Sequence, residues 1–283
     1  MRSYKRVLVL IGPPIIFLVV LFIIPMVMMF LFSFRSSTFG NGDQGWTLEN
    51  YQNFFNQPGY LGLLWRSVLI AFVTALISIL LAYPVSYYLA FKAGPKRFNM
   101  LTILLVPAWT SYLLRILAWK LILSSGGLVN AILLGLGWID DAQPILLYTK
   151  SAVVITLIYS WVPFVTLPIF SSLDRIDTRL LEAAADLGSP PWKSFLRVTL
   201  PLSFPGVIAG FFIVFIPTLG EWVTPHLVGG VTGLMYGNAI QDQFVRALNW
   251  PLGSVMSFIL LALVLVLLLI FSRVGKITDM AGV

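Results

Sequence analysis

The sequence predicts an all-α integral membrane protein with six transmembrane helices, and two observations carry that prediction. Hydrophobic residues make up 59% of the 283 residues and charged residues only 10%, whereas a soluble domain has about 25% charged residues. The few charges also divide the chain into long uncharged runs of the length that crosses a bilayer as a helix. A soluble fold of this size could not bury so much apolar surface, so soluble classes of protein are excluded.

Six uncharged runs are candidates for membrane spans, each of which takes about 20 apolar residues. They are residues 7–34, 67–91, 98–114, 151–173, 198–220 and 247–272. The third run is short and reaches full length only if Arg115 and Lys120 lie near its far end. The first run is too long for a cleavable signal sequence, so it is expected to be a retained span. We therefore place the spans of a single transmembrane domain, residues 1–283, at residues 7–34, 67–91, 98–120, 151–173, 204–226 and 250–272.

The placement of lysine and arginine predicts that both termini are cytoplasmic. With the N-terminus inside, the cytoplasmic segments hold twelve basic residues: Arg2, Lys5, Arg6, Lys92, Lys96, Arg97, Arg175, Arg179, Lys193, Arg197, Arg273 and Lys276. The segments on the other side hold four: Arg35, Arg66, Lys150 and Arg246. Because short cytoplasmic loops carry an excess of Lys and Arg, this orientation is favoured. It places the loop between the fourth and fifth spans in the cytoplasm.

Residues 121–139 are also uncharged and could form a seventh span. A polar and glycine stretch, residues 124–127, interrupts them, and the apolar part that follows is too short to cross a bilayer. A seventh crossing would also move the four basic residues of the 174–203 loop to the outer side. We therefore expect an interfacial or re-entrant segment on the outer side.

The loop at residues 174–203 carries the most specific motif of the chain. Residues 182–201 follow the pattern E-A-A-x3-G-x9-V-x-L-P. Asp177 or Thr178 is a candidate cap for a helix over about residues 179–187, and Gly188 is expected to end that helix in the left-handed conformation. Ser189 is a candidate cap for a second helix with Pro190 in its first turn. The pattern therefore predicts two short helices, joined by a turn, outside the bilayer.

The first of these helices could seal the base of the bundle or dock onto a separate protein. Ala183 and Ala184 allow close approach of another backbone, while Glu182 and Asp186 share a face that can meet donors on a partner. These residues stand in register with Gly188 and with the V-x-L-P stretch, inside a basic loop between two spans. This combination favours docking.

The chain offers no catalytic or metal-binding centre. It has no cysteine and a single histidine, His226, and the zinc-protease pattern H-E-x-x-H is absent. The phosphate-binding pattern G-x-x-x-x-G-K-[ST] is also absent, so any ATP hydrolysis must come from a separate chain. No cofactor is expected in this chain. The net charge of +7 follows membrane topology, and no nucleic-acid partner is expected.

These features resemble a known family of transport proteins. The pattern of residues 182–201 is similar to the EAA loop of ABC importer permeases, although Val198 stands where that loop carries isoleucine. Three further stretches, VPAWTSYLLR at 106–115, GEWVTP at 220–225 and the residues from 237 to 251, resemble spermidine/putrescine-type permeases, a branch of the MetI-like (type I) permeases. The resemblance implies a six-helix MetI-like permease bundle with a cytoplasmic coupling loop, in the bacterial inner membrane.

The resemblance also implies partners, a solute and a coupling role. Two permease subunits, expected to be paralogues, would work with an ABC ATPase dimer that uses ATP and Mg²⁺. A periplasmic solute-binding protein would deliver a small-molecule substrate, expected to be putrescine or spermidine. Related permeases carry other solutes, such as opines, amino-acid-like compounds or inorganic anions. The expected ATPase-coupling residues are Glu182, Ala183, Ala184, Asp186, Gly188, Leu200 and Pro201.

Glu221 is the acid that lies well inside an apolar run, and ionisable residues in membrane spans are candidate functional groups. At 1.5 Å per residue, Glu221 and Arg115 lie at a similar depth, about 22–24 Å from the cytoplasmic side. Glu221 could pair with Arg115 and join two helices, or it could face the pathway and attract an ammonium group. The predicted substrate-pathway residues are Glu221, Trp222, Trp109, Tyr112, Arg115 and Trp119, whose aromatic rings offer cation–π faces.

Two other classes of membrane protein were weighed against an ATP-driven permease. An ion-coupled carrier or channel would work without an ATPase partner, so retention of an ATPase by the solubilised protein distinguishes the two. A membrane enzyme would need a nucleophile–base pair or a metal cluster, and the sequence provides neither.

Overall fold

The computed structural model describes residues 2–36, 45–143 and 145–280, with side chains over 10–36, 45–143 and 145–271. Every named element within these residues is helical. Six helical stretches in them are long and apolar enough to cross a membrane: Leu10–Ser33, Pro58–Phe91, Tyr112–Gly135, Lys150–Asp174, Pro191–Leu219 and Trp250–Phe271. The predicted all-α class with six spans is confirmed. The side chains of Arg2, Lys5, Arg6, Arg273 and Lys276 lie outside the described residues.

The chain divides into two compact units. Unit 1 holds residues 1–62 and 239–266, and unit 2 holds residues 63–238 and 267–283. The helices of unit 1 are α1 (Arg2–Leu18), η1 (Val19–Ile23), α2 (Ile24–Ser33) and α3 (Glu49–Asn56), with parts of α4, α13 and α14 (Trp250–Met280). Within it, the Phe30 ring lies 5.2 Å from the Phe258 ring, and the Ser33 and Tyr51 hydroxyls lie 2.9 Å apart.

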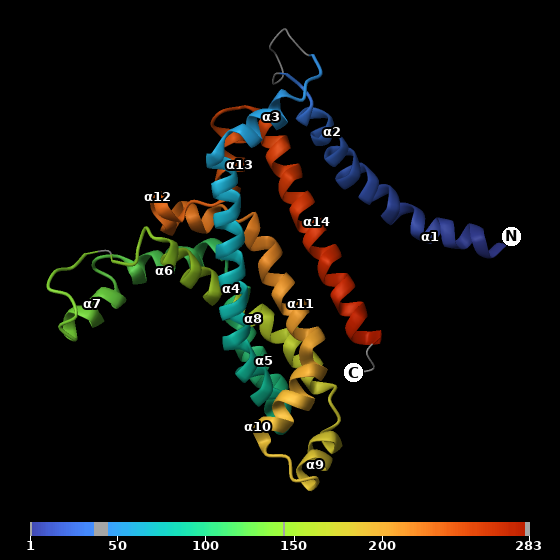
Figure 1. Cartoon of the computed structure of the whole chain (residues 1–283), viewed down its shortest axis with the longest axis vertical. Coiled ribbons are helices and arrows are strands. Elements are labelled where there is room, and N and C mark those ends of the chain that lie inside the picture. Colours follow the sequence, from blue (N-terminus) through green and yellow to red (C-terminus); the bar gives the residue numbers. More distant parts are fainter. Residues whose placement is uncertain (1, 37–44, 144, 281–283) are drawn as a thin grey trace. The chain divides into compact units, whose positions relative to one another are not determined.

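Unit 2 contains the motifs that the sequence singles out. It holds most of α4 (Pro58–Phe91), the first residues of α13 (Tyr236–Val245) and the last part of α14. Its complete elements, in chain order, are η2 (Gly94–Lys96), α5 (Arg97–Leu105), η3 (Val106–Trp109), α6 (Tyr112–Leu123), α7 (Leu128–Gly135), α8 (Lys150–Asp174), α9 (Thr178–Asp186), α10 (Pro191–Ser194), η4 (Phe195–Thr199), α11 (Leu200–Leu219), η5 (Pro225–Gly229) and α12 (Gly230–Gly233). Figure 1 shows α9 and α10 at one end of this unit and α12 at the opposite end. The predicted coupling loop therefore lies at the end opposite the loop that follows α11.

The third predicted span, residues 98–120, is broken into α5, η3 and α6. Pro107 supplies no N–H, and Thr110 and Ser111 adopt extended ψ angles of 156° and 132°. The segment still runs the length of the unit. Leu101 of α5 packs with residues near the C-terminal ends of α4 and α8, whereas Ile116 of α6 packs with residues near their N-terminal ends.

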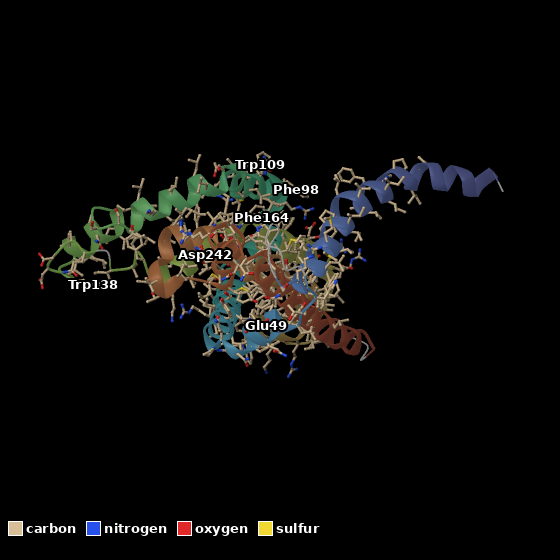
Figure 2. The ribbon with its side chains drawn as sticks, turned by 90° about the horizontal axis from the view of Figure 1, so that it is seen from above. Glu49, Phe98, Trp109, Trp138, Phe164 and Asp242 are labelled. Atoms are coloured by element: carbon tan, nitrogen blue, oxygen red, sulfur yellow. The ribbon has the colours of Figure 1, made fainter. Side chains whose placement is uncertain are left out.

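Residues 121–139 do not form a continuous helix. Length and hydropathy alone select Tyr112–Gly135 as a candidate span, but α6 ends at Leu123 and α7 begins only at Leu128. The Asn130 amide donates to the backbone oxygens of Ser125 and Gln143, which folds α7 into a local arm. Figure 2 shows Trp138 near the far end of this arm.

The fifth span differs from its predicted bounds of 204–226. One helical stretch runs from Pro191 through α10, η4 and α11 to Leu219 and stops at Gly220. Its cap position is Pro190 rather than the predicted Ser189, and Pro191 occupies the first turn. The helix starts early because two consecutive prolines favour a helix start without losing internal hydrogen bonds.

Two glycines bring α11 against α8. A Cβ atom on Gly206 would lie 2.4 Å from the Ser172 Oγ and 2.5 Å from the Pro168 carbonyl oxygen. One turn later, a Cβ atom on Gly210 would lie 3.1 Å from a Val165 methyl carbon. Small residues four apart allow helix backbones to approach closely in membranes. The helices on either side of the coupling loop are therefore packed tightly together.

We expect Gly206→Ala to lower the melting temperature of the purified protein in detergent. The added methyl group meets backbone and side-chain atoms of α8, and such overpacking costs about 1–3 kcal/mol. Gly62→Ala is the matched control, because no atom lies within 4 Å of its added Cβ. Equal melting temperatures for the two variants would contradict close α8–α11 packing.

Candidate functional site

The predicted coupling helix is α9, and its ends are built as the sequence indicates. The Asp177 side chain accepts a hydrogen bond from the Arg179 N–H at 3.0 Å, which satisfies a free donor of the first turn. Gly188 has φ of 76°. The Gly188 N–H donates to the Ala185 oxygen and the Ser189 N–H to the Ala184 oxygen, at 2.8 and 3.0 Å. This is the Schellman arrangement that glycine favours, so the predicted left-handed end is confirmed.

The coupling loop presents its predicted residues to the surface. Helix α9 has no buried residue, and Glu182, Ala183, Asp186 and Gly188 are all exposed, while Ala184 is half-buried. Leu200 and Pro201 are half-buried at the start of α11. Leu187, between α9 and α10, is 88% exposed, and Trp192 in α10 is 61% exposed. The loop thus combines acidic, small and large apolar groups on an accessible surface, a composition suited to contact with another protein.

An ion pair anchors the base of the loop. Arg97, at the start of α5, donates to the Asp174 carboxylate at 2.5 Å, where α8 ends. Ile176 is buried just after it. The first residues of the loop are therefore fixed to two helices before α9 begins. The sequence analysis did not find this pair, because a basic residue and an acid 77 positions apart give no local signal.

Glu221 lies in the turn after α11, where its carboxylate accepts three hydrogen bonds. One oxygen accepts from the N–H groups of Val223 and Thr224, at 2.9 and 3.0 Å. The other accepts from the Tyr112 hydroxyl of α6 at 2.9 Å, and that hydroxyl also lies 2.8 Å from the Thr224 hydroxyl. Glu221 therefore caps the helical segment that follows and ties it to α6.

Glu221 does not pair with Arg115, so that interpretation is wrong. No ion pair joins the two among the described side chains. Arg115 donates instead to the Ser160 oxygen at 3.4 Å, and its guanidinium lies 5.6 Å from the centre of the Tyr112 ring. Tyr112, three residues before Arg115, contacts both side chains: its hydroxyl donates to the carboxylate and its ring faces the guanidinium.

The six predicted pathway residues fall into three places. Tyr112 and Glu221 are hydrogen-bonded, and the next residue, Trp222, is 44% exposed. Arg115 and Trp119 line a cavity against α8. Trp109 is 79% exposed and lies at the edge of the molecule in Figure 2. The first two places adjoin, because the Arg115 guanidinium lies 5.6 Å from the centre of the Tyr112 ring.

Asn238 and Ser67 are two polar residues of this region that the sequence analysis missed. The Asn238 amide donates to the Trp222 oxygen at 2.8 Å and accepts from the Met235 N–H at 3.0 Å. The Ser67 hydroxyl of α4 accepts from the Tyr236 N–H at 2.7 Å. Together with Glu221, these side chains bind backbone groups between residues 222 and 236, a stretch whose helices η5 and α12 are short. The sequence analysis named Asn238 only as part of the stretch 237–251 that resembles a permease family, and Ser67 gave no local signal.

The fold, the exposed loop and the apolar spans define the membrane component of a transport system. A family model described as binding-protein-dependent transport system inner membrane component matches residues 7–279. The chain therefore belongs to this family, and the resemblance predicted from the sequence is confirmed.

Two relatives support the assignment to that family, and two solved structures share its fold. The chain is 38% identical over 234 residues to the spermidine/putrescine transport system permease protein PotB of Haemophilus influenzae, covering 82% of this chain and 81% of the relative. It is 37% identical over 233 residues to the protein of the same name from Escherichia coli, covering 82% of this chain and 84% of the relative.

Two solved structures have a similar fold. A chain of the bacterial alginate ABC transporter, in complex with a periplasmic protein that carries an alginate pentasaccharide, matches with a TM-score of 0.78 and 16% identity, covering 98% of this chain and 97% of that chain. A chain of the inward-facing MetNI methionine ABC transporter matches with TM-score 0.56, 17% identity and coverage of 77% and 95%. At these identities the two structures show a shared fold.

We expect Glu221→Ala to lower the melting temperature more than Glu221→Gln. Alanine removes the cap and leaves donors of the turn without partners, at a cost of about 1–3 kcal/mol. Glutamine keeps an oxygen for the N–H groups and an amide that can donate to Tyr112. Thermal melting of the purified variants is the measurement. The melting temperature of Tyr112→Phe is expected to lie between those of the two Glu221 variants. A larger loss for glutamine than for alanine would contradict the capping role.

We expect Asp174→Asn to speed hydrogen exchange in the peptides that cover residues 174–188. Loss of the ion pair frees the base of the coupling loop, although a partly exposed pair contributes only about 0–1 kcal/mol to global stability. Exchange mass spectrometry is the measurement. Asp242→Asn is the control, because it removes an exposed pair with Arg246 in another part of the chain. The double variant Arg97→Asp with Asp174→Arg reverses the pair and should restore slow exchange. Unchanged exchange of residues 174–188 in Asp174→Asn would refute the anchoring role.

Proposed function

We propose that the chain is the permease subunit of an ATP-driven importer that moves polyamines, putrescine and spermidine, into the cytoplasm. The observation that carries the choice of solute is the identity of 37–38% to two PotB proteins across more than four fifths of both chains. A membrane-spanning subunit of this kind performs no hydrolysis itself, in keeping with the absence of a phosphate-binding loop in the sequence. A separate ATPase dimer would use ATP and Mg²⁺.

The proposed contact with the ATPase is the exposed surface of α9 and the turn after it. Glu182, Ala183, Asp186 and Gly188 are accessible there, and the acids of this surface can meet donors on a partner. Movement of the loop would pass directly into α8 and α11, because both helices are continuous with it and packed against each other. Leu200 and Pro201, at the start of α11, are proposed to transmit that movement.

A permease subunit of this kind would work with further proteins. A second permease subunit, proposed to be a paralogue, would complete the pathway, and a periplasmic solute-binding protein would deliver the solute. This arrangement places α9 and both termini in the cytoplasm and the α12 end of unit 2 on the periplasmic side. The excess of lysine and arginine in the segments assigned to the cytoplasm supports that orientation.

Glu221 is the proposed point at which an ammonium group of the solute meets unit 2. Its carboxylate is held by hydrogen-bond donors, and no described cation forms an ion pair with it. The ring of the next residue, Trp222, is partly exposed and offers a cation–π face, whereas the Tyr112 ring already lies 5.6 Å from the Arg115 guanidinium. Arg115 carries a positive charge that would repel a polyamine, so the proposed solute contact is narrowed to Glu221 and Trp222, with the Tyr112 hydroxyl holding the carboxylate.

Uptake of labelled putrescine and spermidine by cells with and without this chain tests the proposed solute. Deletion, in cells without another polyamine carrier, is expected to abolish high-affinity uptake, and the wild-type chain is expected to restore it. Glu221→Gln, which keeps the hydrogen-bonding groups at this position, is expected to reduce uptake at least tenfold because the ammonium group loses its counter-charge. Unchanged uptake of both polyamines on deletion would exclude them as solutes.

Gly188→Val tests the coupling role independently of the solute. A β-branched residue is strained at a positive φ, so the turn after α9 should distort and uptake should fall while the binding protein still holds its solute. Gly188→Asn is the matched control, since asparagine tolerates the left-handed conformation. Full uptake with Gly188→Val would exclude this turn as a coupling element.

A further inference from the structure

The glycine-rich stretch of residues 229–233, which includes α12, meets the start of α8 in an uncommon backbone conformation. Tyr148, just before α8, has φ of 65°, and Gly230 has φ of 55°. A Cβ atom on Gly230 would lie 2.6 Å from the Tyr148 carbonyl oxygen, and the Tyr148 N–H donates to the Val228 oxygen at 2.8 Å. A left-handed φ is an outlier for a bulky residue. Such strain persists where the surrounding structure imposes it, and it is common at functional sites.

This contact leaves two side chains accessible. Tyr148 is 50% exposed, and Val231, the residue after Gly230, is 83% exposed. Burial of the ring in the core therefore does not explain why Tyr148 keeps a strained backbone. Figure 1 shows α12 at the end of unit 2 opposite α9, away from the coupling loop. An exposed aromatic ring with an exposed aliphatic group near it is suited to the centre of a protein–protein interface.

Three basic side chains lie at the same place. Arg66 of α4 donates to the Thr232 oxygen at 3.3 Å. The Lys120 Nζ lies 5.9 Å from the centre of the Tyr148 ring, and Lys150 is exposed two residues after Tyr148. None of the three cations forms an ion pair with an acid among the described side chains. The outer patch is defined as Arg66, Lys120, Tyr148, Lys150 and Val231.

The outer patch adjoins the proposed solute contact. The Glu221 carboxylate accepts from the N–H groups of Val223 and Thr224, and η5 and α12 follow directly along the chain. A free polyamine is a cation, so the cations of the outer patch repel it. An acidic protein that carries the polyamine is attracted instead, because charge complementarity steers association and sets orientation.

We infer that the outer patch docks the periplasmic solute-binding protein, through an acidic surface with a hollow that receives Val231. This inference rests on the proposed function, in which such a protein delivers the solute. A protein that holds a polycation needs carboxylates, because a buried charge requires a partner of opposite sign. Once that protein is seated on the outer patch, its solute is released beside Glu221. Anionic lipid headgroups would meet the cations alone, and they do not account for the strained and exposed Tyr148.

The first test measures docking with the complete purified transporter in phosphatidylcholine nanodiscs and its purified, putrescine-loaded solute-binding protein. Lys150→Gln is expected to raise the Kd at least fivefold at low salt and to flatten its dependence on salt, because ions screen exposed charges. Arg246→Gln is the matched control, since it removes an exposed arginine from another part of the chain, and its Kd should stay at the wild-type value. An unchanged Kd for Lys150→Gln would overturn the inference.

Tyr148→Asn separates docking from folding. Asparagine tolerates the left-handed conformation, so the melting temperature is expected to stay the same or rise, while loss of the exposed ring raises the Kd at least fivefold. A lower melting temperature with an unchanged Kd would give the ring a structural role only and would overturn the inference.

Cross-linking identifies what covers the outer patch. Val231→Cys, labelled with benzophenone maleimide in this cysteine-free chain, is expected to cross-link to the solute-binding protein. Leu187→Cys is the control, because Leu187 is similarly exposed but lies at the α9 end. Cross-linking of Val231→Cys to lipid or to the second permease subunit instead would overturn the inference. Failure of the wild-type transporter to bind any solute-binding protein would overturn the proposed function as well, whereas binding that none of these variants alters would overturn the inference alone.

Discussion

A backbone that leaves its helix inside a bilayer finds no water to bond with, and unit 2 depends on how its side chains meet that constraint. Between α11 and α13 the chain forms only the short helices η5 and α12, and three polar side chains bind its backbone. Glu221 accepts from two N–H groups, Asn238 binds the backbone on both sides of the stretch, and Ser67 reaches it from α4. These contacts fix the orientation of the carboxylate that the proposed solute would meet.

The two ends of unit 2 differ in how their backbone hydrogen-bonding groups are satisfied. At the α12 end, polar side chains form hydrogen bonds with the backbone. At the α9 end, the backbone is satisfied by a cap and a glycine turn, so the side chains of α9 remain available. Between the ends, Gly206 and Gly210 allow α8 and α11 to pack closely. A displacement at the loop is therefore shared by both helices rather than absorbed between them, since close-packed helices deform little.

Features set by neighbouring residues were predictable from the sequence, and features set by distant contacts were not. Asp177 and Gly188 act within their own turn, so the ends of α9 were foreseen. The break after Pro107 was not, because Pro84 and Pro163 lie inside unbroken helices and proline alone does not distinguish the cases. Residue counting predicted the same depth for Glu221 and Arg115, but equal depth alone does not bring two side chains together. An ion pair also requires that each helix directs its side chain toward the other, and here the Tyr112 hydroxyl binds the Glu221 carboxylate instead.

Helix α9 buries none of its nine residues, and this has an evolutionary consequence under the proposed function. Exposed substitutions usually change stability by less than about 0.5 kcal/mol, so this surface can diverge while the bundle behind it stays intact. A duplicated operon could then acquire a dedicated ATPase through changes confined to a few exposed positions. An engineer could take the same route and graft these nine residues to match a foreign ATPase with this permease.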